Sequence, residues 1–475
     1  MQIEKIKNFN LIYDFRGPSD WIPNALNYYY SLKYFEKDFN ADFELQDYFF
    51  KNFVQPSVFN SFLNCDHLLF NKVTIREYLS KKNKSTGLHS DLSYKNDVCF
   101  YLVEPFGNFN HFLGKQFGGF SETTFLDFVS KDSLDNIRNN NLFYLVINYG
   151  TEGVFALDFF SNLYGILEKY NIPEKKVILL SSAVDIDNLH KKVRNHNPKK
   201  IKTFYWPWSL RYKSQELKKI HDGGDYKFWD NIDQPNTIVN VSDIDSTTKR
   251  NNKFLMMNRR LRPQRIMLLC MLGLDFIKKN LVSYDIKLFD RENNLDFYLH
   301  HGGNDIGGDL YKKSFDILKN EKETIDYDDI TSVWGFNFEN KAPYLNSYIS
   351  IVTETNFYED GLYLSEKTWK PIGHLQPFIQ VNKAGALEEL KNLGFKTFSP
   401  FINEDYDMEI DDRKRIRMIA SEIERLNKLP IEKIHEWYHS IFDILIYNQN
   451  LLFKFAESKR EIEKNFIIKI KESCG

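Results

Sequence analysis

The chain has little cysteine and no long apolar run. Four cysteines occur in 475 residues, at Cys65, Cys99, Cys270 and Cys474, and no two of them have CxxC spacing. We therefore expect a reduced, intracellular protein without a structural zinc site. The apolar run around residues 266–277 falls well short of the roughly 20 residues that span a bilayer, and the start MQIEKIKNFN has no signal core. These absences predict a soluble, cytoplasmic protein with no membrane span.

A strong charge of one sign is also missing. The formal net charge is -2, which gives no general electrostatic case for binding nucleic acid or a membrane surface. Apolar residues make up 42% of the chain and charged residues 27%, a balance typical of a globular protein. The length exceeds one ordinary core and predicts two or three domains.

Apolar segments alternate with helical segments in the first half of the chain. VCFYLVEPF (98–106), NLFYLVINYG (141–150) and KKVILLSSA (175–183) are typical of buried strands. The segment 151–173 between the last two is amphipathic at helical spacing, and its helix is expected to stop before Pro173. A strand, a helix and a strand at this spacing predict a βαβ unit and hence a parallel sheet.

The same pattern returns after a polar stretch, 213–252, which has the composition of a connecting region. Strands are predicted at 253–258, 347–355 and 377–381, and helices at 262–274 and 385–395, the last with a glycine stop at Gly394.

The predicted fold is therefore α/β, with two Rossmann-like domains and a ligand cleft between them. We place the acceptor-side domain at 1–248, the second domain at 249–430, and C-terminal helices that pack back on the first domain at 431–475.

LYLSEKTWKPIGHLQPFIQV (362–381) places an acid–base pair at a predicted helix start. Ser365 is suited to cap a helix that begins at Glu366, and a helix start with free N–H groups favours phosphate. Lys367 would bind that anion and Glu366 would accept hydrogen bonds from hydroxyls. Successive residues point about 100° apart, so we expect the pair to straddle a ligand rather than neutralise itself. A capped surface helix with a chance pair is the alternative.

KFLMMNRRLRPQR (253–265) leads a strand into a basic loop and then a helix. Arginine engages phosphate oxygens through two parallel hydrogen bonds, so Asn258, Arg259, Arg260 and Arg265 are candidates for a phosphate clamp. A solvated basic loop or a nucleic-acid patch would have the same composition.

TETNFYEDGLYLSEKTWKPIGHLQPFIQV (353–381) resembles the donor-binding motif of the α-1,3-fucosyltransferase-like GT-B glycosyltransferases. The resemblance covers about residues 345–407, is weaker at 253–285, and is not evident in the first half. It implies a GT-B fold with the donor in the second domain, Lys367 on the diphosphate and Glu366 on ribose or sugar hydroxyls. Glu354 and Ser365 would belong to the same site. The Trp-Lys-Pro at 369–371 departs from the family, which leaves the donor sugar open.

Transfer to a hydroxyl also needs a carboxylate that takes its proton. Glu152 follows a predicted strand at a Gly-Thr-Glu-Gly turn, where the backbone can approach a ligand closely. Glu104 follows another strand and is its nearest rival. Either residue could instead be a capping acid or a loop charge.

These features together predict a hexosyl- or fucosyltransferase-like enzyme that moves a sugar from a nucleotide-diphosphate donor to an acceptor hydroxyl, with inversion and without a metal or other cofactor. The acceptor would be a glycan or another hydroxyl, including one on a modified DNA base. The alternatives are a non-catalytic nucleotide- or polysaccharide-binding protein and a nucleic-acid-acting protein.

Overall fold

The structure is a computed structural model, and it divides the chain into two compact units. The first comprises residues 1–207 with 459–475, and the second comprises residues 208–458. The residues that the structure describes are 9–13, 70–75, 78–80, 97–103, 126, 129–149, 158–194, 201–224, 237–260, 262–285, 339–358 and 360–457.

The first unit contains a six-stranded parallel sheet in the order β2-β1-β3-β4-β5-β6. The strands are β1 (Phe9–Tyr13), β2 (Phe70–Thr74), β3 (Val98–Val103), β4 (Phe143–Tyr149), β5 (Val177–Ser181) and β6 (Lys202–Tyr205). The described helices of this unit are α6 (Lys131–Asn139), α7 (Asp158–Lys169), the short 3-10 helix η6 (Glu174–Lys176) and α8 (Ile186–Arg194). A parallel sheet is covered on both faces, which explains why β5 is buried along its whole length.

Three strands of this sheet were expected from the sequence. The predicted strands at 98–106, 141–150 and 175–183 are β3, β4 and β5, and the predicted helix is α7. Residues 151–157 of that predicted helix lie outside the described part of the chain.

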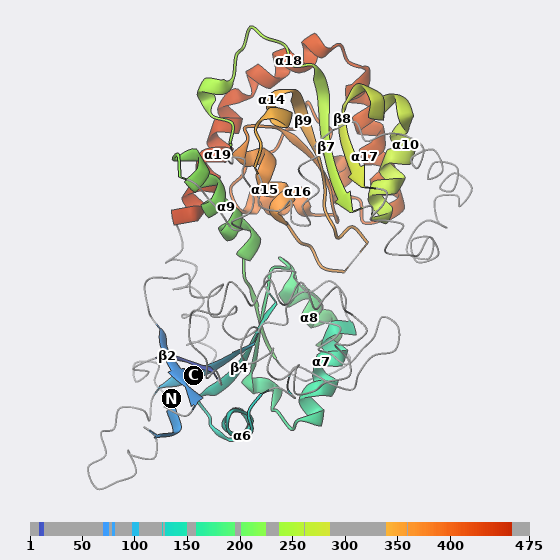
Figure 1. Ribbon diagram of the computed structural model, residues 1–475. Helices are drawn as coiled ribbons and strands as arrows, with labels where there is room; N and C mark the ends of the chain where they lie inside the picture. Colours follow the sequence, from blue (N-terminus) through green and yellow to red (C-terminus); the bar gives the residue numbers. More distant parts are fainter. Residues whose placement is uncertain are drawn as a thin grey trace. The chain divides into compact units, whose positions relative to one another are not determined.

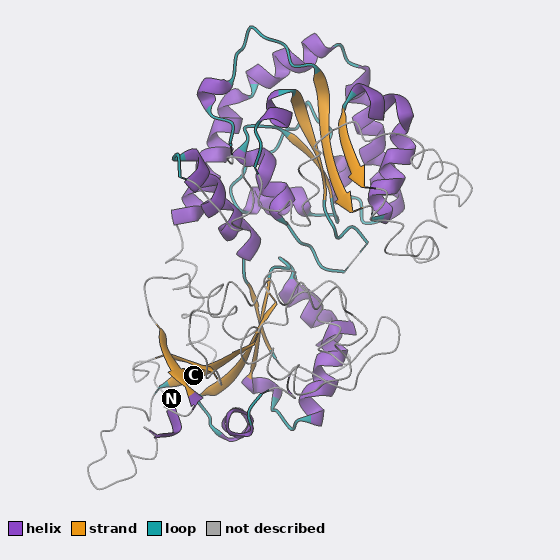
Figure 2. Cartoon of the chain, viewed as in Figure 1, coloured by secondary structure: helices purple, strands orange, loops and turns teal. Residues whose placement is uncertain are grey.

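The second unit contains a four-stranded parallel sheet in the order β10-β9-β7-β8. Figure 2 draws its strands in orange among the purple helices. Its strands are β7 (Asn252–Arg260), β8 (Leu281–Asp285), β9 (Ser347–Thr353) and β10 (Phe378–Val381). Its described helices are α9 (Trp208–His221), η7 (Val241–Asp243), α10 (Pro263–Lys279), α14 (Ala342–Leu345), α15 (Glu366–Gly373), α16 (Ala386–Asn392), η9 (Asp405–Met408), α17 (Asp412–Lys428), α18 (Ile431–Ser440) and α19 (Phe442–Glu457). α10 packs with α17 on one side of the sheet, and α15 packs with α9 and α19 on the other (Figure 1).

The strands and helices predicted between 253 and 395 match elements of the second unit closely. The predicted strands at 253–258, 347–355 and 377–381 are β7, β9 and β10, and the predicted helices are α10 and α16. Gly394 has a positive φ of 92° just beyond α16, in the left-handed region that a glycine stop uses.

The division between the units differs from the predicted boundary at 248. Residues 213–221, which have the composition of a connection, belong to α9, a helix of the second unit. Leu210 and Leu217 of α9 are buried, and so are its Lys213 and Glu216, which form an ion pair at 2.9 Å. Amino-acid composition does not distinguish buried charges from solvated ones. For this reason the sequence pattern indicated a connection where the structure has a helix. α18 and α19 also belong to the second unit.

Candidate functional site

The candidate site lies where the strand order of the second sheet reverses. From β7 the chain goes to β8 on one side, and it returns to β9 on the opposite side of β7. In open α/β sheets, ligands bind outside the carboxyl ends of the strands at such a switch point. β7 and β9 are parallel neighbours, so both strands end at the same edge of the sheet. α10 follows β7 and α15 follows β9, so both helices begin near that edge.

Asn258 and Arg265 bring the ends of β7 and β9 together. The Thr353 hydroxyl donates to Oδ1 of Asn258 at 2.5 Å, and Nη2 of Arg265 donates to the Thr353 carbonyl at 2.8 Å. Gln264 Nε2 donates to the Glu354 carbonyl at 2.7 Å. Asn258 is 2% exposed, and its Nδ2 has no hydrogen-bond partner within the described residues. A buried amide with an unused donor fits a bound acceptor atom.

The structure describes only part of the predicted phosphate clamp. Arg265 is buried and directs its guanidinium to the backbone of β9, so it fixes the start of α10 to the neighbouring strand. Arg259 and Arg260 end β7, but their side chains lie outside the described part of the structure.

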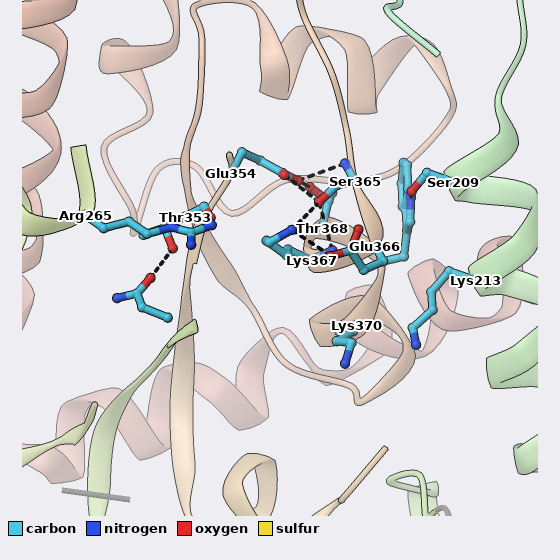
Figure 3. Close-up of polar contacts among 12 residues, drawn as sticks. Ser209, Lys213, Arg265, Thr353, Glu354, Ser365, Glu366, Lys367, Thr368 and Lys370 are labelled. Atoms are coloured by element: carbon cyan, nitrogen blue, oxygen red, sulfur yellow. Dashed lines mark hydrogen bonds and ion pairs between the residues drawn. The ribbon is translucent and has the colours of Figure 1, made fainter. Parts of the chain in front are cut away.

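Glu354 fixes the start of α15. Its carboxylate accepts hydrogen bonds from the Ser365 N–H at 2.9 Å, the Ser365 hydroxyl at 2.5 Å and the Thr368 hydroxyl at 2.7 Å (Figure 3). Gln380 on β10 also donates to Thr368, at 2.9 Å. Glu354 is 0% exposed, and a carboxylate is favourable at the positive end of a helix. This residue, predicted to contact the donor, instead positions the helix that carries the acid–base pair.

Ser365 caps α15, as predicted. Its hydroxyl accepts the Lys367 N–H at 3.2 Å, and its carbonyl accepts the Thr368 N–H at 3.1 Å. The N–H groups of Ser365, Lys367 and Thr368 are thus all engaged within the protein. These three N–H groups are therefore not free for a phosphate, because Glu354 and Ser365 accept their hydrogen bonds.

Glu366 and Lys367 form an ion pair, with 2.6 Å between Oε1 and Nζ. The expectation that they would not neutralise each other is therefore wrong, because the flexible lysine side chain reaches back across the first turn. Burial alone would raise the pKa of Glu366, but the charge and hydrogen bond of Lys367 outweigh it and hold the pKa below its usual value. The side chains of Glu366 and Lys367 are 21% and 26% exposed, so solvent and small solutes can reach both.

A buried charge network lies against the opposite end of α15. Glu339 contacts Lys370 Nζ at 3.1 Å and His374 Nε2 at 3.1 Å, and it also pairs with Lys213. Lys213 bridges to Glu216 on α9. We call these five residues the Glu339 network. It ties α9, α15 and the segment before α14 into one body.

The protonation of the Glu339 network follows from its contacts. Burial alone would raise the pKa of Glu339, but the charges of Lys213 and Lys370 hold it well below the usual range. Burial raises the pKa of Glu216 and lowers the pKa of His374. Val239 N–H donates to Nδ1 of His374 at 3.3 Å, so Nε2 carries the proton that is donated to Glu339.

Sequence reasoning missed this network because its members come from distant parts of the chain. Lys213 and Glu216 share a helical turn that composition assigned to a connection, and Glu339 lies 123 residues beyond Glu216. The helical spacing of Lys370 and His374 was the one available signal.

Apolar and hydrogen-bonding contacts also join α15 to α9. The buried Trp369 donates from Nε1 to the Ser209 hydroxyl at 3.1 Å. A Cβ atom at Gly373 would lie 2.7 Å from a methyl group of Leu217, so any larger residue there would require the Leu217 side chain to shift.

Glu152 and Glu104, the predicted bases, lie outside the described residues. Within the described ranges, no group of three or more His, Cys, Asp and Glu side chains is arranged to hold a metal ion. No helix in the same ranges combines the length and apolar character that crossing a membrane requires.

Comparison with known proteins adds little to this geometry. No protein-family model matches the chain, and no curated protein matches it. Among solved structures, it is similar to an alpha,alpha-trehalose-phosphate synthase (UDP-forming) from Burkholderia vietnamiensis, with 10% sequence identity and a TM-score of 0.35. The similarity covers 96% of this chain and 100% of that one. At this TM-score it supports no conclusion about activity.

Proposed function

We propose that this protein is a GT-B-type glycosyltransferase that binds a nucleotide-diphosphate sugar at the switch point of its second sheet. The observation that carries the proposal is the pairing of a solvent-accessible Glu366–Lys367 with the buried Asn258 amide at one edge of that sheet. Hydrogen bonds connect these residues. Asn258 accepts one from the Thr353 hydroxyl, and the adjacent Glu354 accepts one from the Ser365 N–H at the start of α15.

Each group suits one part of such a donor. The ammonium of Lys367 is the accessible positive charge of this helix start, and it would exchange its bond to Glu366 for the diphosphate. Glu366, with its pKa held low, stays ionised at neutral pH and can accept two hydroxyl hydrogen bonds. The unused N–H groups of Asn258 would donate to an oxygen of the nucleotide.

The proposed reaction is a single displacement. The acceptor oxygen forms a bond to the anomeric carbon, the bond from that carbon to the diphosphate oxygen breaks, and the acceptor proton passes to a carboxylate. We propose Glu152 as that base, with Glu104 as its rival. Negative charge develops on the departing diphosphate, so the Lys367 ammonium stabilises the transition state more than the ground state.

A thermal-shift screen tests the binding step. The panel is UDP-glucose, UDP-N-acetylglucosamine, GDP-mannose and GDP-fucose, with the matching nucleoside diphosphates. A donor at about 100 times its Kd adds about 2.7 kcal/mol, which raises Tm by about 5 °C for a domain of this size. No shift with any compound would contradict the proposal.

Slow hydrolysis of the stabilising donor in the absence of acceptor separates an enzyme from a binding protein. Binding without hydrolysis, and without transfer to any glycan or hydroxylated DNA acceptor, would instead favour the non-catalytic alternative.

A further inference from the structure

Lys370 connects the candidate site to the Glu339 network. It lies four residues after Glu366 on α15, and residues at this spacing share one face of a helix. Its ammonium contacts Glu339 at 3.1 Å, and its side chain is 14% exposed, whereas the carboxylate it contacts is 1% exposed. Figure 3 shows Lys370 one turn further along α15 than Glu366, with no bond drawn between them. Lys370 is therefore the member of the Glu339 network that shares a helix face with Glu366.

Donor binding would leave Glu366 without its present partner. In this structure Lys367 is bonded to Glu366 at 2.6 Å. A lysine that turns to a diphosphate abandons that bond, and a carboxylate that is mostly removed from solvent is costly without a partner. The donor hydroxyls would then bond Glu366 but bring no charge, so a second cation beside it would stabilise the ionised carboxylate.

We propose that Lys370 is a positioning residue of the donor site: when Lys367 turns to the diphosphate, the Lys370 ammonium takes its place beside the Glu366 carboxylate. This inference rests on the proposed function and names a regulatory contact within the same site. Lys370 acts through Glu366 and does not touch the reacting atoms.

Glu339 keeps two partners if Lys370 leaves the Glu339 network. Glu339 keeps Lys213 and the Nε2 proton of His374 when Lys370 leaves. Lys213 in turn remains bonded to Glu216 at 2.9 Å. Glu339 has three cationic or N–H partners here, so it would retain a cation and an N–H donor after Lys370 moved.

The charged groups around this part of α15 are few in the described structure. α9 contributes Lys213 and Glu216, the end of β9 contributes Glu354, and the segment before α14 contributes Glu339. α19 contributes the neutral Gln449, which donates to the Gly373 carbonyl at 2.7 Å. The positive field of Lys370 acts on both Glu366 and Glu339. Lys370 is thus placed to serve either carboxylate.

The test is the pH dependence of donor affinity in Lys370→Gln, measured by calorimetry with the sugar nucleotide that most stabilises the wild-type chain. Glutamine keeps an N–H donor for Glu339 but removes the charge. With Lys367 on the diphosphate, burial would then raise the pKa of Glu366. As pH falls, the variant should therefore lose donor affinity at a higher pH than the wild type does. We expect the Kd ratio between pH 5 and pH 7.5 to be about tenfold larger in the variant, as for a shift of one pKa unit.

Lys370→Arg keeps the positive charge and should show the wild-type pH profile. If the side chain served only to maintain the fold, the pH profile would not follow its charge. Lys249→Gln, which removes an exposed ion pair with Glu432, is the matched control and should leave the profile unchanged. If Lys370→Gln does not fold, Lys370→Met serves in its place. A wild-type profile in the neutral variants overturns this inference and leaves the proposed function intact. Absence of any nucleotide-sugar binding by the wild-type chain overturns both.

Discussion

Removing the Glu354 carboxylate should unfold the start of α15. The carboxylate accepts three hydrogen bonds and is fully buried. Hydrogen bonds to a charged group contribute about 1.5–3 kcal/mol each. The Ser365 and Thr368 hydroxyls can rotate to other acceptors, but the Ser365 N–H cannot. We therefore expect Glu354→Ala to destabilise the second unit by about 3–5 kcal/mol.

Urea unfolding followed by far-UV circular dichroism measures this loss. Glu354→Gln keeps one carbonyl oxygen in the same shape and should cost less, about 1–2 kcal/mol. Glu432→Ala is the control, because its ion pair with Lys249 is 51% exposed on each side and should contribute less than about 1 kcal/mol. If Glu354→Ala costs no more than Glu432→Ala, Glu354 does not hold the helix in place.

Three further outcomes are expected. Gly373→Ala should cost about 1–3 kcal/mol, and Leu217→Ala in the same chain should cost less than the two single changes added together, by urea unfolding. Because the folded pKa of Glu339 lies below its unfolded value, its stabilisation is present above the unfolded pKa and is lost as pH falls through the folded one. Glu339→Gln should therefore weaken the loss of stability as pH falls below the unfolded value of 4.5. Glu152→Gln should cut turnover by about two to four orders of magnitude with donor affinity nearly intact, and near-normal turnover would contradict its role.

The sequence was most informative where local chemistry and periodicity agree. Buried parallel strands are continuous apolar segments, so β3, β4, β5 and β9 could be predicted from composition alone. The cap at Ser365 and the start of α15 at Glu366 follow from the preference of serine for that position.

The missed features depend on contacts between distant residues. Whether Lys213 lies in solvent or in a buried ion pair depends on Glu339, which is 126 residues away. Glu354 could be placed at the end of a strand, but its use as an anchor depends on the path of the loop that brings Ser365 back to it. The Glu366–Lys367 pair shows the same limit, since helix geometry gives the direction of each Cβ and not the reach of a lysine.

The central claim is that Lys367 meets the diphosphate of a nucleotide sugar while Glu366 meets its hydroxyls. Donor titration by calorimetry, run beside turnover measurements on Lys367→Ala and Glu366→Ala, tests it most directly. Lys367→Ala should lower turnover by about two to three powers of ten more than it weakens binding, whereas Glu366→Ala should chiefly weaken binding. Unchanged binding and turnover in both variants would make the pair part of a capped surface helix and contradict the account.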